Sequence, residues 1–347
     1  MTVLTQSMFP EKFADETELE DFMALPSQAL IDDMARLDGD IMILGVGGKM
    51  GPTLARLARR AAPDKRIIGV ARFTNEDVRK RLESWRVETL KCDLLNRNEV
   101  AKLPKIPNVI FMAGKKFGTD GNEHFTWAMN TYAPALVAEH LTDSRIVGFS
   151  TILVYPYTRV SHQGSIDADL PRARPGEYAN SCVGRERIFE HFSHLNGSAG
   201  RMLRLAYSID MRYGVLHEIA TQVRNGETID LTAGHVNVIW QGDANTQTLR
   251  TLLHCTRPSS PLIVSGPETT SIRALALAIG AELGKAPRFA GEEADSCVVV
   301  NPRETARLFG YPMVPVSQMV KWISRWVDND GLSWNMPCHY EVRDGMF

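Results

Sequence analysis

The fold of this chain is decided by the stretch Ile41-Met42-Ile43-Leu44-Gly45-Val46-Gly47-Gly48-Lys49-Met50-Gly51. Its apolar first half predicts a buried strand over 41–44, and the glycines predict a tight turn into a helix over 54–60. Glycine lets a backbone turn sharply and approach a pyrophosphate, and the following helix supplies N–H groups and its positive dipole end. The stretch therefore predicts a nucleotide-binding loop; a tight strand–helix turn without a ligand is the alternative.

Outward from this loop, short apolar runs alternate with helical segments. Further strands are expected over 66–70, 108–112 and 145–149, and a helix over 125–140. Buried strands that alternate with helices imply βαβ units and a doubly wound parallel sheet with helices on both faces. After Leu205 the alternation becomes irregular, which predicts a smaller mixed α/β lobe with helices over 216–224 and 271–283.

The composition excludes several classes of protein. The 347 residues are 44% hydrophobic and 23% charged, which is ordinary for a globular chain and unlike a disordered, collagenous or coiled-coil one. The net charge of −2 predicts neither a nucleic-acid nor a membrane partner. No apolar run approaches the ~20 residues of a membrane span, and the acidic N-terminus does not resemble a signal peptide. Five scattered cysteines without a C-x-x-C pair indicate reduced thiols, no metal site and a cytoplasmic protein.

The end of the second expected strand bears on the choice of cofactor. An acid there would bond a ribose 2′-hydroxyl, whereas a cation would accommodate a 2′-phosphate. The strand ends in Val70-Ala71-Arg72, with no acid at that place. Arg72 therefore favours NADP over NAD; the alternative is a solvated arginine at a strand end.

Taken together, these motifs resemble the extended short-chain dehydrogenase/reductase family, the NAD(P)-dependent epimerase/dehydratase group. Gly45, Gly48 and Gly51 reproduce its G-x-x-G-x-x-G spacing. The other matching segments are Cys92–Leu95, Phe111–Gly114, Asn130, Phe149–Tyr155, Glu177–Glu186 and Val238–Asp243. The resemblance covers about residues 40 to 328 and implies a Rossmann-type cofactor domain followed by a lobe that reads the substrate.

The resemblance also implies roles for individual residues. Asp93 would contact the adenine, Thr151 would hold the reacting oxygen of the substrate, and Tyr178 would move its proton. The residues implied in cofactor binding are Gly45, Gly47, Gly48, Lys49, Met50, Gly51, Arg72, Asp93, Leu94, Ala113, Gly114 and Asn130.

The chain departs from the family where the catalytic lysine should stand. Four residues after Tyr178 the family has a lysine, and this chain has Cys182. A cation beside a tyrosine lowers its pKa from about 10, at about 1.4 kcal/mol per unit, and a neutral thiol does not. Lys115, Lys116 and Arg185 are alternative cations, and Lys115 joins Thr151, Tyr178 and Cys182 as a candidate catalytic residue. Cys182 itself is either a nucleophile or a small residue beside the cofactor ribose.

The domain boundaries follow from the same segments. Residues 40–207 and 232–264 are predicted to form the Rossmann domain, and 208–231 and 265–330 the substrate lobe, followed by a tail over 331–347. Residues 1–39 form an N-terminal extension with an amphipathic stretch over 28–37. This extension is either an arm that covers a crevice or a partner, or a helix packed outside the main domain.

Two functions remain open at this stage. The first is an NAD(P)-dependent epimerase, dehydratase or reductase acting on a sugar or nucleotide sugar. The second is a non-catalytic NADP-binding sensor or scaffold that has lost the active-site lysine. By analogy with the family, the helices around Asn130 and Ser181 would form the face of a homodimer.

Overall fold

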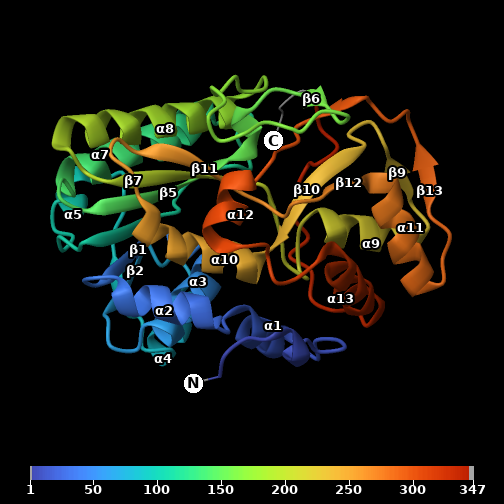
Figure 1. The fold of residues 1–347 in the computed structure, drawn as a ribbon, viewed down its shortest axis with the longest axis horizontal. Coiled ribbons are helices and arrows are strands. Elements are labelled where there is room, and N and C mark those ends of the chain that lie inside the picture. The colour runs from blue at the N-terminus through green and yellow to red at the C-terminus, as the bar shows by residue number, and fades with distance from the viewer. Residues whose placement is uncertain (1, 344–347) are drawn as a thin grey trace.

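A seven-stranded parallel sheet organises the larger lobe (Figure 1). The computed structural model describes residues 2–343, and it confirms the predicted doubly wound α/β fold. The strand order is β11-β7-β5-β4-β1-β2-β3, so the winding reverses between β1 and β4. The strands are β1 (Ile41–Leu44), β2 (Ile67–Ala71), β3 (Glu88–Lys91), β4 (Asn108–Phe111), β5 (Arg145–Thr151), β7 (Gly200–Leu205) and β11 (Ser260–Val264).

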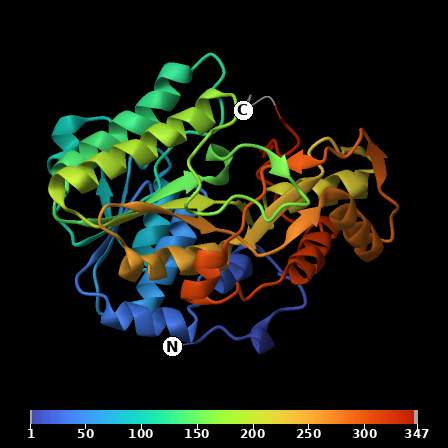
Figure 2. The same ribbon diagram turned by 45° about the horizontal axis from the view of Figure 1, so that its top comes forward.

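Helices cover both faces of this sheet because its strands are apolar on both sides. Ile41 and Ile43 of β1 belong to one core, and Met42 and Leu44 belong to the other. In Figure 2 the green and yellow-green helices α7 and α8 lie above the sheet, and the blue α2 and orange α10 lie below it. The covering helices are α2 (Gln28–Arg36), α3 (Gly51–Ala61), α4 (Glu76–Ser84), α5 (Arg97–Val100), α7 (Ala133–His140), α8 (Glu177–Asn196) and α10 (Gln241–Thr251).

The helix predicted over 125–140 is divided into three parts. α6 (Glu123–Trp127) leads into a π-helical turn, η2 (Ala128–Tyr132), and α7 follows. Pro134 lies in the first turn of α7 and has no backbone N–H to donate to the preceding turn. Such π turns are frequent at functional sites, and this one carries the buried Asn130.

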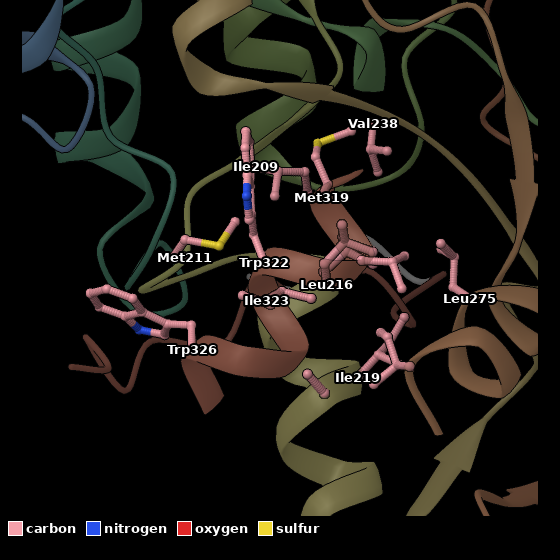
Figure 3. Close-up of a cluster of buried hydrophobic side chains, with 14 of the residues drawn as sticks. Ile209, Met211, Leu216, Ile219, Val238, Leu275, Met319, Trp322, Ile323 and Trp326 are labelled. Atoms are coloured by element: carbon pink, nitrogen blue, oxygen red, sulfur yellow. The ribbon is translucent and has the colours of Figure 1, made fainter. Parts of the chain in front are cut away.

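The smaller lobe has a core of its own, part of which Figure 3 shows. Trp322 packs there at 5.4 Å from Trp240, measured between ring centroids. Three short strands form one sheet, β12 (Thr269–Ser271), β10 (His235–Trp240) and β8 (Tyr207–Ile209), and β9 (Thr228–Asp230) pairs with β13 (Arg288–Ala290). The helices are α9 (Val215–Asn225), α11 (Ile272–Leu283) and α13 (Val316–Asp328).

Segment 232–264, which the sequence assigns to the Rossmann domain, is shared between the lobes. β10 lies in the small sheet and supplies Val236, Val238 and Trp240 to the smaller core. α10 packs on α3 below the main sheet, and β11 forms the edge of that sheet. α12 (Arg303–Phe309) packs on β11 and α10, and β6 (Thr158–Arg159) pairs with β14 (Ser296–Cys297).

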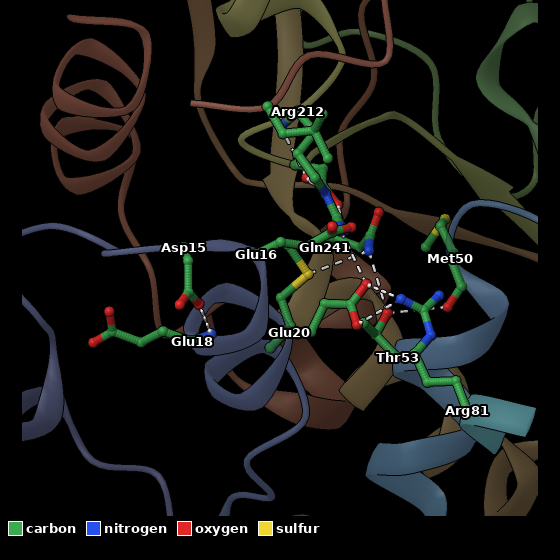
Figure 4. A network of polar contacts seen from close by, with 12 residues as sticks. Asp15, Glu16, Glu18, Glu20, Met50, Thr53, Arg81, Arg212 and Gln241 are labelled. Atoms are coloured by element: carbon green, nitrogen blue, oxygen red, sulfur yellow. Dashed lines mark hydrogen bonds and ion pairs between the residues drawn. The ribbon is translucent and has the colours of Figure 1, made fainter. Parts of the chain in front are cut away.

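The N-terminal extension packs against both lobes. A 3₁₀ turn (Gln6–Met8) precedes α1 (Glu16–Met23), whose buried side chains join the smaller core, whereas those of α2 join the core of the larger lobe. Glu20 of α1 lies between two arginines (Figure 4): it accepts hydrogen bonds from Arg81 of α4 and from Arg212 of the smaller lobe. The extension therefore braces the two lobes against each other.

The C-terminal segment 331–343 returns across the molecule toward the larger lobe. Trp334 N donates to Arg212 O at 3.0 Å, and Cys338 N donates to Glu218 Oε1 at 2.6 Å. Near its end, Arg174 donates to Val342 O at 2.5 Å. Within residues 2–343, no helix is both long and apolar enough to span a bilayer.

Candidate active site and cofactor groove

The glycine loop connects β1 to α3, and its glycines have different structural roles. Gly45 has a φ of +90°, and a Cβ there would lie 2.6 Å from Ala113 N. A Cβ on Gly51 would lie 2.1 Å from Val46 O, so only glycine lets α3 start this close to the strand. A Cβ on Gly48 would meet nothing nearer than Gly45 O at 3.5 Å. Gly45 and Gly51 therefore shape the turn, and Gly48 leaves its backbone open to the space above it.

That space is a groove of about 280 Å³ along the carboxyl ends of β1, β2 and β4. Ligands of open α/β sheets bind at such ends, where the strand order reverses. The groove brings together eight of the twelve residues predicted to bind the cofactor: Gly45, Gly47, Gly48, Arg72, Asp93, Leu94, Ala113 and Gly114.

Arg72 and Asp93 lie at the far end of this groove. Arg72 is exposed at the end of β2 and forms no ion pair within residues 2–343, so its guanidinium can reach a ligand. The Asp93 carboxylate accepts a hydrogen bond from Leu95 N at 3.0 Å, and Asp93 N donates to Glu99 Oε2 at 2.7 Å. These two bonds hold the loop after β3 against the groove.

A second cavity of about 400 Å³ adjoins the groove and shares Gly45, Gly48, Met112 and Gly114 with it. Thr151 and Tyr178 both line it. Thr151 ends β5, and its Oγ1 accepts a hydrogen bond from Leu153 N at 3.2 Å, which fixes the side chain. The structure thus brings the two predicted proton-handling residues together in the cavity next to the groove.

The Tyr178 hydroxyl interacts with Thr151 and Cys182 by hydrogen bonds and with Arg185 through its charge. Burial raises the pKa of Tyr178 well above its usual range, and Cys182 raises it further. The Arg185 guanidinium and a hydrogen bond with Thr151 act in the opposite direction and lower the pKa of Tyr178. Tyr178 is therefore a phenol that holds its proton firmly, and Arg185 favours its release.

Cys182 is fully buried on α8. Burial raises the pKa of its thiol, although Arg185 and a hydrogen bond with Tyr178 lower it. A buried neutral thiol is a poor nucleophile. The environment of Cys182 therefore fits the small-residue alternative better than the nucleophile.

Arg185 and Asn130 form a buried polar cluster beneath the loop that follows β4. Arg185 Nη1 donates to Phe149 O at 2.8 Å, and Nη2 donates to Asn130 Oδ1. Asn130 Nδ2 donates at 2.9 Å to Lys115 O and to Ser181 Oγ, and Lys115 N donates back to Asn130 Oδ1 at 2.9 Å. Asn130 thus positions the loop from behind instead of lining the groove.

Three lysines around this loop have different environments. The Lys115 ammonium lies 5.1 Å from the Phe125 ring centroid, and Lys115 lines neither cavity. Lys116 lines the second cavity and donates to Cys338 O at 3.2 Å, and burial lowers the pKa of Lys116. Lys49 also lines the second cavity, with its Nζ 3.5 Å from the Tyr213 ring centroid. Burial, and then Lys116, lower the pKa of Lys49 to about 8.

No protein-family model and no curated protein sequence matches this chain, but solved structures match its fold. UDP-glucuronic acid 4-epimerase from Bacillus cereus, in complex with UDP-glucuronic acid and NAD, matches with a TM-score of 0.70 at 15% identity, over 84% of this chain and 99% of that one. UDP-glucose 4-epimerase from Thermotoga maritima matches with a TM-score of 0.69 at 13% identity, over 84% and 99%. The Bordetella bronchiseptica enzyme WbmH, in complex with NAD+, matches with a TM-score of 0.68 at 18% identity, over 85% and 99%.

This chain has the fold of these three enzymes. The matches cover nearly the whole of each neighbour, so both the sheet lobe and the smaller lobe belong to that fold. About 16% of this chain lies outside the match to the Bacillus cereus enzyme.

Sequence reasoning missed several residues of the second cavity. Phe117, Tyr213 and Cys338 line it although they lie in three separate parts of the chain. Met50 was grouped with the cofactor residues and lines this cavity instead of the groove. No local pattern could have found Cys338, because only the path of the C-terminal segment brings it there. Within residues 2–343, no group of three or more His, Cys, Asp or Glu side chains could hold a metal ion.

Proposed function

We propose that this chain binds NAD(P) in the groove and catalyses hydride exchange at a hydroxyl-bearing carbon of a sugar or nucleotide sugar. One observation carries the proposal: the glycine-loop groove opens directly into the cavity that holds Thr151 and Tyr178, and the two share four lining residues. The fit to a dinucleotide rests on the open backbone at Gly48 and on the tight turn at Gly45. The similarity in fold to an epimerase and to the enzyme WbmH, both crystallised with NAD, supports the same class of cofactor.

In this proposal, different residues of the chain bind the substrate and transfer its proton. The chemistry that NAD(P) supplies when bound is the acceptance and return of a hydride. Thr151 orients the substrate hydroxyl, and Tyr178 takes its proton and returns it. Arg185 stabilises the phenolate of Tyr178 by its positive charge and so takes the part of the missing lysine.

Two finer features belong to the same proposal. Arg72, exposed at the end of the groove, favours NADP by pairing with a 2′-phosphate. A homodimer would form through α7 and α8 and the π turn, where Tyr132 of the π turn and Trp127 at the end of α6 are exposed large aromatic side chains.

Cofactor binding and turnover can be measured separately. The purified chain is titrated with NADP and NAD, and then incubated with UDP-glucose or UDP-glucuronic acid while absorbance at 340 nm and the sugar products are followed. We expect binding of cofactor, slow turnover of a sugar, and loss of turnover without loss of binding in Tyr178→Phe. Failure of the parent to bind either cofactor would overturn the proposal.

The second candidate function is a non-catalytic NADP-binding sensor. It is favoured by the strongly raised pKa of Tyr178, because a phenol that seldom ionises is a slow base at neutral pH. Tight cofactor binding, combined with identical redox behaviour of the parent and Tyr178→Phe, would decide for this alternative.

A further inference from the structure

The C-terminal segment, residues 331–343, forms part of the wall of the second cavity. It runs from the end of α13 toward β6 and contains no helix or strand (Figure 1). Cys338 of this segment lines the cavity. The Phe117 ring, which also lines the cavity, lies 6.4 Å from the ring of His339, measured between centroids. The segment is therefore in contact with the cavity that holds the two proton-handling residues.

Two charged side chains, one from each lobe, hold the backbone of Cys338. Its N–H donates to Glu218 Oε1 of α9 at 2.6 Å. Its carbonyl accepts a hydrogen bond from Lys116 Nζ, in the loop after β4, at 3.2 Å. Hydrogen bonds to charged groups are stronger than those between neutral groups. Glu218, Cys338 and Lys116 thus form a latch that fixes the segment at the point where it lines the cavity.

The end of the segment is attached mainly through its backbone. Tyr157 Oη donates to Arg343 O at 3.0 Å, and Arg174 Nη2 donates to Val342 O at 2.5 Å. Of the residues 331–343, only Cys338 and Tyr340 are buried. A segment with few buried side chains and no regular secondary structure opens at a lower free energy than the core on which it lies.

Two residues with a left-handed backbone flank the turn that carries Cys338. Asn335 has a φ of +50° and His339 a φ of +56°. Asn and His adopt this conformation more readily than most other residues, but an extended backbone is still more favourable for them. Release of the latch would let both residues extend, which offsets part of the cost of opening. Asn335 and His339 are therefore suited to act as hinges.

We propose that the C-terminal segment is a gate of the second cavity. It swings about Asn335 and His339 when the latch opens, and the substrate enters and the product leaves through the opening. The inference rests on the proposed function in that it takes this cavity as the substrate site. When the latch is closed, the segment shields Thr151 and Tyr178 from water, which protects the proton transfer between them and the substrate.

The test measures how fast iodoacetamide labels buried thiols, read peptide by peptide in a mass spectrometer. The reporter on the gate is Cys338 of the parent. The reporter inside the cavity is the thiol introduced by Ser208→Cys in a Cys338→Ser background, because Ser208 lines the cavity and its hydroxyl is buried. Cys92 is the internal reference, since it is 2% exposed like Cys338 but lies in the cofactor groove.

Glu218→Leu removes the acceptor of the latch and keeps most of the side-chain volume. Labelling occurs from the open state, so the loss of a charged hydrogen bond should raise both reporter rates about 10- to 100-fold and leave Cys92 unchanged. Tyr157→Phe removes one hydroxyl from the second attachment and should raise both rates by a smaller factor. Glu282→Leu, which replaces an exposed acid of α11, is the matched control and should change no rate.

A rise at Cys338 without a rise at the introduced cavity thiol would overturn the proposal, because the segment would then loosen without controlling access. Unchanged rates at both reporters in Glu218→Leu would overturn it as well. If Glu218→Leu also raises the labelling of Cys92, the whole fold has loosened and Tyr157→Phe decides. Both reporters must then rise while Cys92 stays unchanged, and any other result overturns the proposal.

The labelling needs neither cofactor nor substrate, so it keeps the gate apart from the proposed function. Cofactor titration of the same proteins is a separate measurement. A parent that binds no cofactor would overturn the proposed function, whereas the labelling rates would still show whether the segment controls access to the cavity.

Discussion

Gly48 and Gly51 lie three residues apart in the same loop and should respond oppositely to substitution. A Cβ on Gly48 meets no protein atom closer than 3.5 Å, whereas a Cβ on Gly51 lies 2.1 Å from Val46 O. We expect Gly48→Val to fold normally and to lose at least about 10-fold in cofactor affinity, because its side chain occupies the space of the ligand. Gly51→Val should instead lower the thermal unfolding temperature.

Cofactor titration and thermal unfolding of both variants distinguish the two effects. Undiminished cofactor affinity in Gly48→Val would mean that the loop does not bind a dinucleotide. Normal stability of Gly51→Val would mean that α3 can move away from the strand.

Arg72 is the residue on which the choice of cofactor depends. Its guanidinium stands exposed at the end of the groove, where a 2′-phosphate would pair with it. We expect the parent to bind NADP more tightly than NAD, and Arg72→Asp to reverse the preference through repulsion of the phosphate. Calorimetry with both cofactors measures this, and tighter binding of NAD to the parent would refute the assignment.

At the scale of elements, α8 carries the altered catalytic motif and its substitute. Arg185 lies two helical turns after Tyr178 and lowers the pKa of the phenol, and Cys182 lies between them. We expect Arg185→Met to move the rise of activity with pH toward higher pH, because the phenolate loses its cation. Adding Cys182→Lys to Arg185→Met should restore part of the lost activity at neutral pH.

The pH profiles of the parent, Arg185→Met and the double variant test this exchange of cations. Arg185 is buried and hydrogen-bonded to Asn130 and Phe149, so unfolding curves must accompany the rates. A stable, folded Arg185→Met with an unshifted profile would show that the charge of Arg185 does not act on Tyr178.

Asp243, in the first turn of α10, should make stability depend on pH. Burial raises the pKa of this carboxyl to about 6, although a hydrogen bond from Val314 N at 2.9 Å opposes the shift. The folded protein therefore holds the proton more tightly than the unfolded chain, whose aspartates titrate near 3.9. The free energy of unfolding therefore rises as the pH falls from about 6 to 4 and Asp243 takes up its proton. Above pH 6 the buried Asp243 carboxylate is charged and destabilises the fold in full.

Urea unfolding of the parent and of Asp243→Asn at pH 5 and pH 7 measures this effect. Between pH 7 and pH 5 the parent should gain about 1 kcal/mol on the variant, because about one pKa unit of the shift is realised over that interval. An identical difference between the two proteins at both pH values would contradict the prediction.

Elements that depend on neighbours in the sequence could be predicted, and those that depend on distant parts of the chain could not. The apolar run at 41–44 and the glycines after it are sufficient for β1, the loop and α3. The π turn at Asn130 was not predicted, because a helical pattern does not reveal where Pro134 makes the backbone bulge. β10 lies in the smaller sheet because its partners are β8 and β12, and an apolar strand pattern does not specify a partner.

The candidate site shows the same limit. The sequence identified Thr151 and Tyr178 through their motifs, and the structure places them in one cavity. The sequence could not show that Lys116 lines the cavity and Lys115 does not. The direction of each side chain depends on how Asn130 holds the backbone of the loop. The sequence could not predict that Cys338 lines the cavity, because only the three-dimensional path of the C-terminal segment brings it there.

At the scale of the whole molecule, Arg212 connects the lobes from a buried position. It is 1% exposed and pairs with Asp210, Glu16 and Glu20, while Glu20 also binds Arg81 of the larger lobe. We expect Arg212→Met to lower the free energy of unfolding by about 3–5 kcal/mol, because it leaves the buried Asp210 carboxylate without its cation. Arg66→Met, which removes an exposed ion pair with Glu88, should have little effect.

Urea unfolding of the two variants gives both free energies. If Arg212→Met and Arg66→Met were equally stable, the buried cluster would contribute no more than a surface pair, and the bracing of the lobes would have to come from apolar packing alone.

The packing of the N-terminal extension also governs the order of events during synthesis. Trp322 Nε1 donates to Pro10 O at 2.8 Å across 312 residues, and Phe13 stacks in the same core. A contact of such sequence separation forms late, because the intervening chain must first be made and ordered. The sheet strands β1 to β5 can pair on the ribosome while Leu19 and Phe22 of α1 are still exposed to solvent. A nascent chain stalled before residue 322 would therefore expose an apolar N-terminal segment. Such segments bind chaperones, and they aggregate when chaperones are scarce.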